Sequence, residues 1–316
     1  MNTKKIFMNI KNKLQIIIIT YNRAKKLNKT LIQLLKNDSP VKEYNILIID
    51  NNSTDNTSDL VKKFQIQHKN LSYIKNNINV GMGGNITKAI ELANKDYIWI
   101  LGDDDNYCWD NWNEVEEGIT NDKDIICVSN EDLSKNKKSL DELLFQLVFL
   151  PAGIWKKSLV NDTIMRNVYD NAYTIMPHLC PMIYAINKGA NIQIVSKSIA
   201  NYGYDGNTDV SYSRGNINED LYPKVQKLKF IVCYANIING LKNKEHRKQC
   251  LDFAIRNKKI YNGYKHFYIN MVKHCCNDKQ LSNWVDVFVQ LYPKHKFILA
   301  IKTIIKFIIN LFRGTH

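Results

Sequence analysis

Paired cysteines are absent from this sequence. Its seven cysteines are scattered, and only Cys275 and Cys276 lie close together. No CxxC pair and no Cys/His spacing typical of a zinc site occurs, so the sequence gives no support for a structural zinc centre. An odd, unpatterned set of cysteines is typical of reduced thiols, and this predicts a cytoplasmic protein.

Long apolar runs are also missing from the first half of the chain. The basic stretch from Met1 to Lys13 is followed by only four isoleucines, Ile16–Ile19, before polar residues return. This run is too short for the core of a signal peptide or for a transmembrane helix. We therefore expect at least the first half of the protein to be cytoplasmic.

Acidic residues are scarce relative to basic ones. The 316 residues include 44 lysines and arginines against 30 aspartates and glutamates, a formal net charge of +14. Such an excess of positive charge gives information about binding partners rather than about the fold. Anionic lipid, phosphorylated substrates and nucleic acid are all compatible with it. Because the lysines are spread widely and no RNA- or DNA-binding module can be recognised, we expect no nucleic-acid partner.

The order of apolar segments predicts an α/β fold. Short, β-branched runs typical of buried strands lie at 14–19, 44–49, 71–75 and 97–101, with later candidates at 124–128 and 192–195. Segments of helical spacing lie between them, at 24–36, around 60–64 and at about 85–93. This βαβαβαβ order implies a mostly parallel sheet flanked by helices.

The composition changes after about residue 216. Glycine and proline become rare, and apolar residues recur at helical intervals. We therefore expect one nucleotide-binding and catalytic domain at 1–215 and a helical appendage at 216–316.

No glycine-rich loop follows the first predicted strand. A dinucleotide-binding Rossmann fold would place GxGxxG there, and a nucleotidyltransferase would place a basic, glycine-rich phosphate loop near it. The strand ends instead in Thr20-Tyr21-Asn22-Arg23. This absence excludes the dinucleotide fingerprint and counts against a nucleotidyltransferase, which remains an alternative.

Three consecutive aspartates, Asp103–Asp105, follow the predicted strand at 97–101. Adjacent carboxylates repel each other unless a cation or a hydrogen-bond donor neutralises them. The carboxyl ends of strands in open α/β sheets are where ligands bind, and such a cluster suits a hard divalent cation that bridges to a phosphate. The alternative is an acidic turn that caps the next helix.

Four motifs in register resemble the family 2 glycosyltransferases of the GT-A fold. They are T-Y-N-R at 20–23, D-N-N-S-T-D-N-T at 50–57, N-V-G-M-G-G-N at 79–85 and G-D-D-D at 102–105. The match covers about residues 14–111, a third of the chain. The resemblance implies a GT-A fold and a nucleotide-sugar donor bound by Thr20, Tyr21, Arg23, Asp50, Asn52, Gly81, Asp103 and Asp104. A UDP-linked donor is favoured because a carboxylate such as that of Asp50 can accept from the imide N–H of uracil.

The resemblance also implies Mg²⁺ or Mn²⁺ at the donor diphosphate. In the family a D-x-D pair binds the ribose side and this cation. Asp103 and Asp105 match that spacing and are the expected metal ligands, with Asp104 as an alternate. The cation would act as a Lewis acid on the departing diphosphate.

The general base is less well defined by the motifs. Family members invert the anomeric carbon and need a base for the acceptor hydroxyl, commonly within an acidic pair about a dozen residues before a glycine. The comparable glycine is Gly189, and the segment at 173–178 contains no acidic pair. His178, whose imidazole has a suitable pKa, and Asp170 are the catalytic candidates, followed by Asp205 and Asp209. A chain without a base would be a catalytically inactive nucleotide-sugar-binding protein, and this alternative stays open.

A further segment, at 151–155, resembles the part of the family that shapes the acceptor and donor-sugar pocket. Its Trp155 would either stack on a sugar ring or belong to the core.

The C-terminal segment from Phe297 to Phe312 is strongly apolar and carries one polar stripe, formed by Lys302, Lys306, Asn310 and Arg313. It is too short and too charged to span a bilayer, but it suits a helix at 297–313 that lies on an anionic membrane surface. The alternative is a helix packed on the body of the protein. Membrane attachment would make the enzyme peripheral on the inner face of the cell membrane, with an acceptor on a lipid-linked oligosaccharide, a lipooligosaccharide or a capsule glycan.

Overall fold

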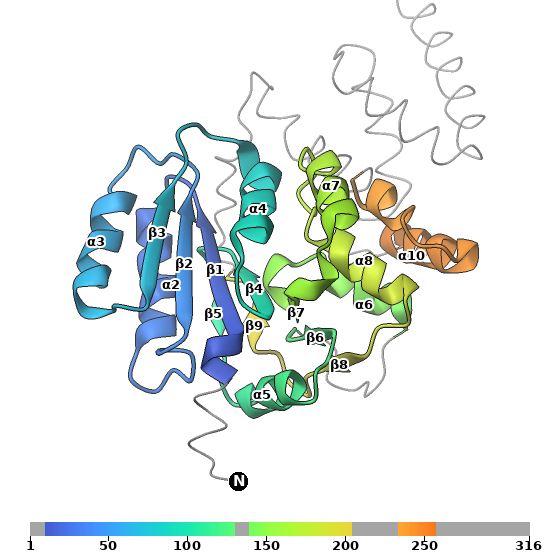
Figure 1. Ribbon diagram of the computed structural model, residues 1–316, viewed down its shortest axis with the longest axis horizontal. Coiled ribbons are helices and arrows are strands. Elements are labelled where there is room, and N and C mark those ends of the chain that lie inside the picture. The colour runs from blue at the N-terminus through green and yellow to red at the C-terminus, as the bar shows by residue number, and fades with distance from the viewer. Residues whose placement is uncertain (1–9, 130–138, 204–232, 257–316) are drawn as a thin grey trace, which may run out of the picture.

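The computed structural model describes residues 10–129, 139–203 and 233–256 (Figure 1). Its main sheet has the strand order β3-β2-β1-β4-β7-β6-β8, and β5 and β9 form a separate pair. The strands are β1 (Leu14–Thr20), β2 (Asn45–Asp50), β3 (Leu71–Lys75), β4 (Tyr97–Leu101), β5 (Asn106–Tyr107), β6 (Ile125–Cys127), β7 (Gly153–Lys156), β8 (Ile192–Ile194) and β9 (Ala200–Asn201). The helices are α2 (Ala24–Leu35), α3 (Thr57–Gln67), α4 (Gly81–Leu92), α5 (Trp112–Thr120), α6 (Leu140–Gln146), α7 (Asp162–Asp170), α8 (Leu179–Asn187) and α10 (Lys244–Arg256), with 3₁₀ turns η1 (Leu150–Ala152) and η2 (Lys157–Leu159).

The first four strands pair in parallel with one another, as the sequence predicts. β1 pairs in parallel with both β2 and β4, and β2 pairs in parallel with β3. All seven residues of β1 are buried, because helices cover both faces of a parallel sheet and leave neither face to solvent. Helices α2 and α3 contact each other, whereas α4 packs against β1 and β4. The crossovers toward β3 and the crossover back to β4 run in opposite directions, so right-handed connections place α4 on the opposite face from α2 and α3.

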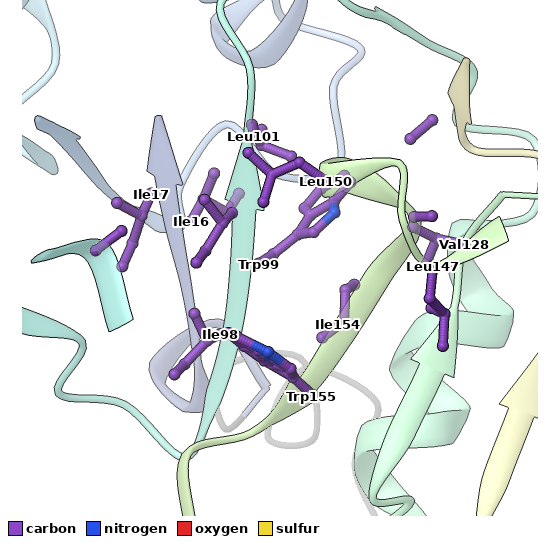
Figure 2. Close-up of a cluster of buried hydrophobic side chains, with 14 of the residues drawn as sticks. Ile16, Ile17, Ile98, Trp99, Leu101, Val128, Leu147, Leu150, Ile154 and Trp155 are labelled. Atoms are coloured by element: carbon purple, nitrogen blue, oxygen red, sulfur yellow. The ribbon is translucent and has the colours of Figure 1, made fainter. Parts of the chain in front are cut away.

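The far half of the sheet contains an antiparallel strand that the sequence analysis did not foresee. β7 is inserted between β4 and β6 and runs antiparallel to both. It brings Trp155 into register with Ile98, and the two side chains lie together in Figure 2. Trp155 is 1% exposed, so of its two predicted roles the structure supports the core one. Trp99 fixes the approach to β7 by donating from Nε1 to the carbonyl of Pro151 at 2.8 Å.

The strand order defines where a ligand can bind. From β1 the chain moves outward to β2 and β3 and then returns to the other side of β1 as β4. The strand order therefore reverses between β1 and β4, and such a switch point is where ligands bind in α/β sheets. Thr20 ends β1 and the three aspartates follow β4, so the two strongest motifs of the sequence meet at this point.

The described part of the C-terminal region packs on α6. Residues 233–238 are helical, α10 contacts α6, and the ring of Phe145 lies edge-on to the rings of Tyr234 and Phe253. Within the described residues no helix combines the length and the apolarity needed to cross a bilayer. The predicted domain boundary at 215/216, the candidate bases Asp205 and Asp209, and the predicted surface helix at 297–313 lie outside the described residues.

Helix α4 begins at Gly81, four residues before the predicted start, and its first turn is glycine-rich. At Gly83 the helix backbone approaches the turn after α7 so closely that a Cβ would lie 1.9 Å from the carbonyl oxygen of Thr174 and 2.2 Å from that of Ala172. Only glycine fits this contact. It sets the distance between α4 and the segment in which the family's base is expected.

Replacing Gly83 by alanine should therefore lower stability, although alanine is the better helix former by about 1 kcal/mol. Overpacking against rigid backbone costs about 1–3 kcal/mol, which corresponds to a fall of several degrees in the thermal midpoint. Gly84→Ala is the matched control, because its added Cβ would meet only the Val80 side chain at 3.1 Å. Equal melting of both variants, measured by circular dichroism, would contradict the close contact.

Candidate functional site

The candidate site lies at the carboxyl ends of β1, β2 and β4. Thr20, the last residue of β1, stands in register with Asp50, the last residue of β2. From the other side, Thr20 Oγ1 donates to Oδ2 of Asp103 at 2.6 Å. The structure thus brings together residues that are 83 positions apart in the sequence, as the motif order predicts.

Asp103 is the buried centre of the acidic motif. It is 0% exposed, and Arg23 Nη1 lies 2.8 Å from its Oδ1. Arg23 also forms an ion pair with Asp104, and Lys26 Nζ lies 3.6 Å from Asp104 Oδ2. Burial raises the pKa of Asp103 to about 7, against the opposing effects of Arg23 and the Thr20 hydroxyl. Arg23, predicted to bind the nucleotide, therefore has a second role as the counterion of the acidic motif.

Asp105 differs from its two neighbours because the described residues include no ion pair to it. Its carboxylate accepts a hydrogen bond from the backbone N–H of Gly203, and burial followed by the charge of Asp104 raises its pKa to about 7. An added cation would favour the ionised form of this carboxyl group. Of the two predicted metal ligands, Asp105 is the better placed, because Asp103 is already held by Thr20 and Arg23.

The described residues contain no group of three or more His, Cys, Asp or Glu side chains that could hold a metal by themselves. The absence of such a group does not exclude Mg²⁺ at the aspartates, because this ion is commonly held by one or two carboxylates together with substrate phosphates and water. Asp105, with Asp104 beside it, fits a cation that takes its remaining ligands from a diphosphate.

Helix α2 holds the acidic motif through Gln33. Its Nε2 donates to the carbonyl of Asp105 at 3.1 Å, and its Oε1 accepts from the N–H of Tyr107 at 3.1 Å. The two bonds fix the backbone on both sides of Asn106. The sequence analysis assigned no role to Gln33, which lies among apolar helix residues and carries no motif signal.

The loops after β1 and β2 are joined to each other. Asn22 donates from its backbone N–H to Ser53 Oγ at 2.8 Å and accepts from the N–H of Thr54 at 2.6 Å. Asn22 and Asn52 have φ angles of 51° and 68°, a left-handed conformation that asparagine tolerates better than most residues. Tyr21 and Asn52, both expected to bind the donor, are half-buried on these loops.

Asp50 is tied to the protein through both oxygens. Oδ1 accepts from the N–H of Ser53 at 2.7 Å, and Oδ2 accepts from the hydroxyl of Tyr73 at 2.6 Å. Asp50 is also fully buried. The predicted nucleotide contact of Asp50 stays a prediction, and in this structure its hydrogen bonds hold the loop that follows it.

An asparagine network, which the sequence analysis missed, supports the start of α4. Asn51 accepts from Asn76 Nδ2 at 3.0 Å and from the N–H of Val80 at 2.9 Å, and it donates to Asn79 at 2.7 Å. It also donates to the carbonyl of Gly81 at 3.3 Å. Gly81, predicted to lie near the donor sugar, has a φ of 75° and is held in place by this network. The available signal was the clustering of asparagine next to Asp50 and on both sides of Gly81.

The structure argues against His178 as the general base. The side chain is 1% exposed, and its Nε2 lies 3.1 Å from the carbonyl of Leu147. Burial lowers the pKa of His178 to about 4. An enclosed imidazole of this kind is part of the core rather than a partner for an acceptor hydroxyl.

Asp170, the other catalytic candidate, is exposed at the end of α7. It directly precedes the turn that contacts Gly83. The structure thus leaves Asp170 accessible, three residues before the segment at 173–178 in which the resemblance places the base.

The profile of the glycosyl transferase family 2 matches residues 15–189, more than half of the chain. The chain belongs to glycosyltransferase family 2. The matched range contains all four motifs and ends at Gly189. The family assignment made from those motifs is thereby confirmed.

Several curated glycosyltransferases resemble parts of the chain. A glycosyltransferase of Mycoplasma pneumoniae is 41% identical over 95 residues, which are 29% of this chain and 32% of that protein. The abequosyltransferase RfbV of Salmonella typhimurium is 29% identical over 116 residues, which are 36% of this chain and 35% of that protein. The poly(ribitol-phosphate) beta-glucosyltransferase of Bacillus spizizenii is 22% identical over 187 residues, and the match covers 53% of this chain and 30% of that protein. The matched stretch spans about a third of the length of these relatives.

Solved structures agree on the fold over a longer range. The mannosyltransferase PcManGT of Pyrobaculum calidifontis, in complex with GDP-Man and Mn²⁺, superposes with a TM-score of 0.53 at 13% identity, covering 92% of this chain and 87% of that one. TarS 1–349 of S. aureus, in complex with UDP-GlcNAc, superposes with a TM-score of 0.50 at 17% identity, covering 81% of this chain and 90% of that one. At these identities the likeness concerns the fold alone, and it confirms the predicted GT-A-like architecture.

The burial of His178 predicts how stability depends on pH. The folded protein binds this proton only near pH 4, whereas the unfolded chain binds it near the ordinary value of 6.5. Between these values the unfolded state holds more protons, so stability falls as pH is lowered from 6.5 to 4, by about 2–3 kcal/mol from this group.

His178→Gln, which keeps a donor for Leu147 but cannot titrate in this range, should become more stable relative to the parent as the pH of the denaturant melts is lowered from 7 to 5.5 and 4.5. His68→Gln, at the half-exposed residue that follows α3, is the control. An unchanged slope in His178→Gln would show that His178 is not buried in its neutral form.

Proposed function

We propose that this family 2 protein is an inverting, metal-dependent glycosyltransferase that moves a sugar from a UDP-linked donor to a hydroxyl of an acceptor glycan. The observation that carries the proposal is the acidic motif at the end of β4, bound by Thr20 and Arg23 from the end of β1. This arrangement places carboxylates at the switch point of the sheet, where nucleotide ligands bind in such folds. The UDP-GlcNAc bound by TarS and the GDP-Man and Mn²⁺ bound by PcManGT are consistent with such a donor.

Each residue of the site has a separate task in this proposal. Thr20 and Arg23 favour the ionised form of Asp103 and hold it beside the ribose and diphosphate. Asp105 takes the cation, Mg²⁺ or Mn²⁺, which stabilises charge on the departing diphosphate when bound. The loops around Asn52 and Gly81 complete the donor pocket. The acceptor hydroxyl oxygen attacks the anomeric carbon from the side opposite to the leaving diphosphate, and Asp170 takes the proton of this hydroxyl during the attack.

The acceptor and the location of the protein are inferred from relatives and from the C-terminal sequence. Two relatives, the poly(ribitol-phosphate) beta-glucosyltransferase of Bacillus spizizenii and a Campylobacter jejuni beta-1,3-glucosyltransferase of an undecaprenol-linked glycan, motivate a polymeric or lipid-linked acceptor. The apolar, singly striped sequence at 297–313 motivates attachment to an anionic membrane on its inner face. A catalytically inactive donor-binding protein is the second candidate, favoured by the missing acidic pair at 173–178.

Asp105→Asn should remove most of the metal-dependent part of UDP binding. The amide keeps the size of the side chain but cannot carry the charge that attracts the cation, and hydrogen bonds to charged groups contribute about 1.5–3 kcal/mol. Calorimetry with UDP, with and without Mn²⁺, should show an affinity at least about ten-fold lower only when Mn²⁺ is present. Asp110→Asn, an exposed aspartate after β5, is the control. Equal affinity of Asp105→Asn and parent in Mn²⁺ would remove the metal assignment.

Asp170→Asn should lower turnover by roughly 10²–10⁴-fold, the usual contribution of a general base, while leaving UDP affinity unchanged. Hydrolysis of UDP-sugars without acceptor is a suitable readout, because water then takes the place of the acceptor hydroxyl. Asp162→Asn, at the opposite end of α7, is the matched control. Full activity in Asp170→Asn would move the base to another residue, and a parent that binds UDP but hydrolyses none of the donors would favour the inactive binding protein.

A further inference from the structure

Tyr202 is an exposed aromatic residue directly beside the acidic motif. Its side chain is 60% exposed, although it follows strand β9, which pairs with β5 immediately after Asp105. The position of this ring relative to the reacting groups can be followed from its neighbours.

The backbone next to Tyr202 lies against the acidic motif. A Cβ added to Gly203 would lie 1.6 Å from the carbonyl oxygen of Asp104 and 3.0 Å from the Cα of Asp105. The N–H of Gly203 also donates to the Asp105 carboxylate. Tyr202 is therefore one residue away from a chain segment that directly contacts the expected metal ligand.

A buried phenylalanine supports the tyrosine ring. The ring centroids of Phe149 and Tyr202 are 3.9 Å apart, with an interplanar angle of 33°, and Phe149 is only 8% exposed. Phe149 immediately precedes η1, where the carbonyl of Pro151 is held by Trp99 of β4. One aromatic face of Tyr202 thus packs on a side chain that is anchored to the core. This packing restricts the rotamers of Tyr202, so a ligand that binds there loses less side-chain conformational entropy.

The strand order separates this ring from the nucleotide side of the site. Thr20, Arg23 and Asp50 belong to the ends of β1 and β2, on one side of β4. Phe149 leads into β7, on the other side of β4. The acidic motif therefore lies between the predicted nucleotide pocket and Tyr202, and a sugar at Tyr202 would be on the side from which an acceptor approaches.

We propose that Tyr202, supported by Phe149, is the platform on which a pyranose ring of the acceptor stacks. The C–H face of a pyranose is apolar and fits the face of an aromatic ring. The proposal rests on the proposed glycosyltransferase function and names the residue that selects a sugar acceptor over water or a simple alcohol. It needs the ring of Tyr202 rather than its hydroxyl.

The test compares Tyr202→Leu, which still covers Phe149 but has no aromatic ring, with Tyr202→Phe and Tyr202→Trp, which keep one. The probe is a panel of methyl hexopyranosides, with binding measured by saturation-transfer NMR in the presence of UDP and Mn²⁺. Tyr202→Leu should weaken glycoside binding by about ten-fold, and the two aromatic variants should stay within about three-fold of the parent. Tyr184→Ala, a half-exposed tyrosine on α8, should bind as the parent does.

Calorimetry with UDP and Mn²⁺ separates this proposal from the function on which it rests. Parent protein that fails to bind UDP would overturn the donor assignment whatever Tyr202 does. If UDP is bound equally by parent and Tyr202→Leu while glycoside binding falls only in Tyr202→Leu, the platform is supported. Loss of UDP affinity in Tyr202→Leu would place the ring in the donor site, and unchanged or absent glycoside binding in parent and variant alike would also overturn the proposal.

Discussion

The ion pair between Arg23 and Asp103 joins the ends of β1 and β4, and the rest of the site depends on it. Asp103 is a fully buried carboxylate, and a buried charge is strongly destabilising unless a counterion and hydrogen bonds compensate it. Arg23 supplies the charge at 2.8 Å and Thr20 supplies the hydrogen bond at 2.6 Å. Because Arg23 immediately precedes α2, the same contact fixes the start of that helix relative to the acidic motif.

Further contacts extend this arrangement outward from the ion pair. Gln33, on α2, bonds to the backbone on both sides of Asn106, so the helix positioned by Arg23 in turn positions the residues after the acidic motif. Gly203 closes the motif from the opposite direction. Asp105 is thus set by a helix on one side and by the backbone after β9 on the other, and its carboxylate is the acidic group left for a cation.

The sequence predicted the parallel half of the fold well because its signals there are local. Buried parallel strands are short and continuous, and the predicted strand at 97–101 matches the fully buried β4 residue for residue. The predicted strand at 71–75 likewise matches β3, which lies at the edge of the sheet. The strand β7 was missed because its four residues, Gly153–Lys156, follow a proline and carry too little periodicity to be distinguished from a loop. Its place between β4 and β6 is decided by pairing with strands that are far away in the sequence.

The site divides in the same way. By itself the sequence determined that Thr20, Asp50 and Asp103–Asp105 would meet, because parallel strands bring their carboxyl ends to one edge of a sheet. Only the tertiary structure decided how these groups are used. Burial and competing partners pair Asp103 with Arg23, leave Asp105 without an ion pair among the described residues and enclose His178 in the core. The solvation and charge environment of a side chain depends on everything packed around it, and that surrounding is assembled from distant segments, so no local pattern in the sequence could have specified it.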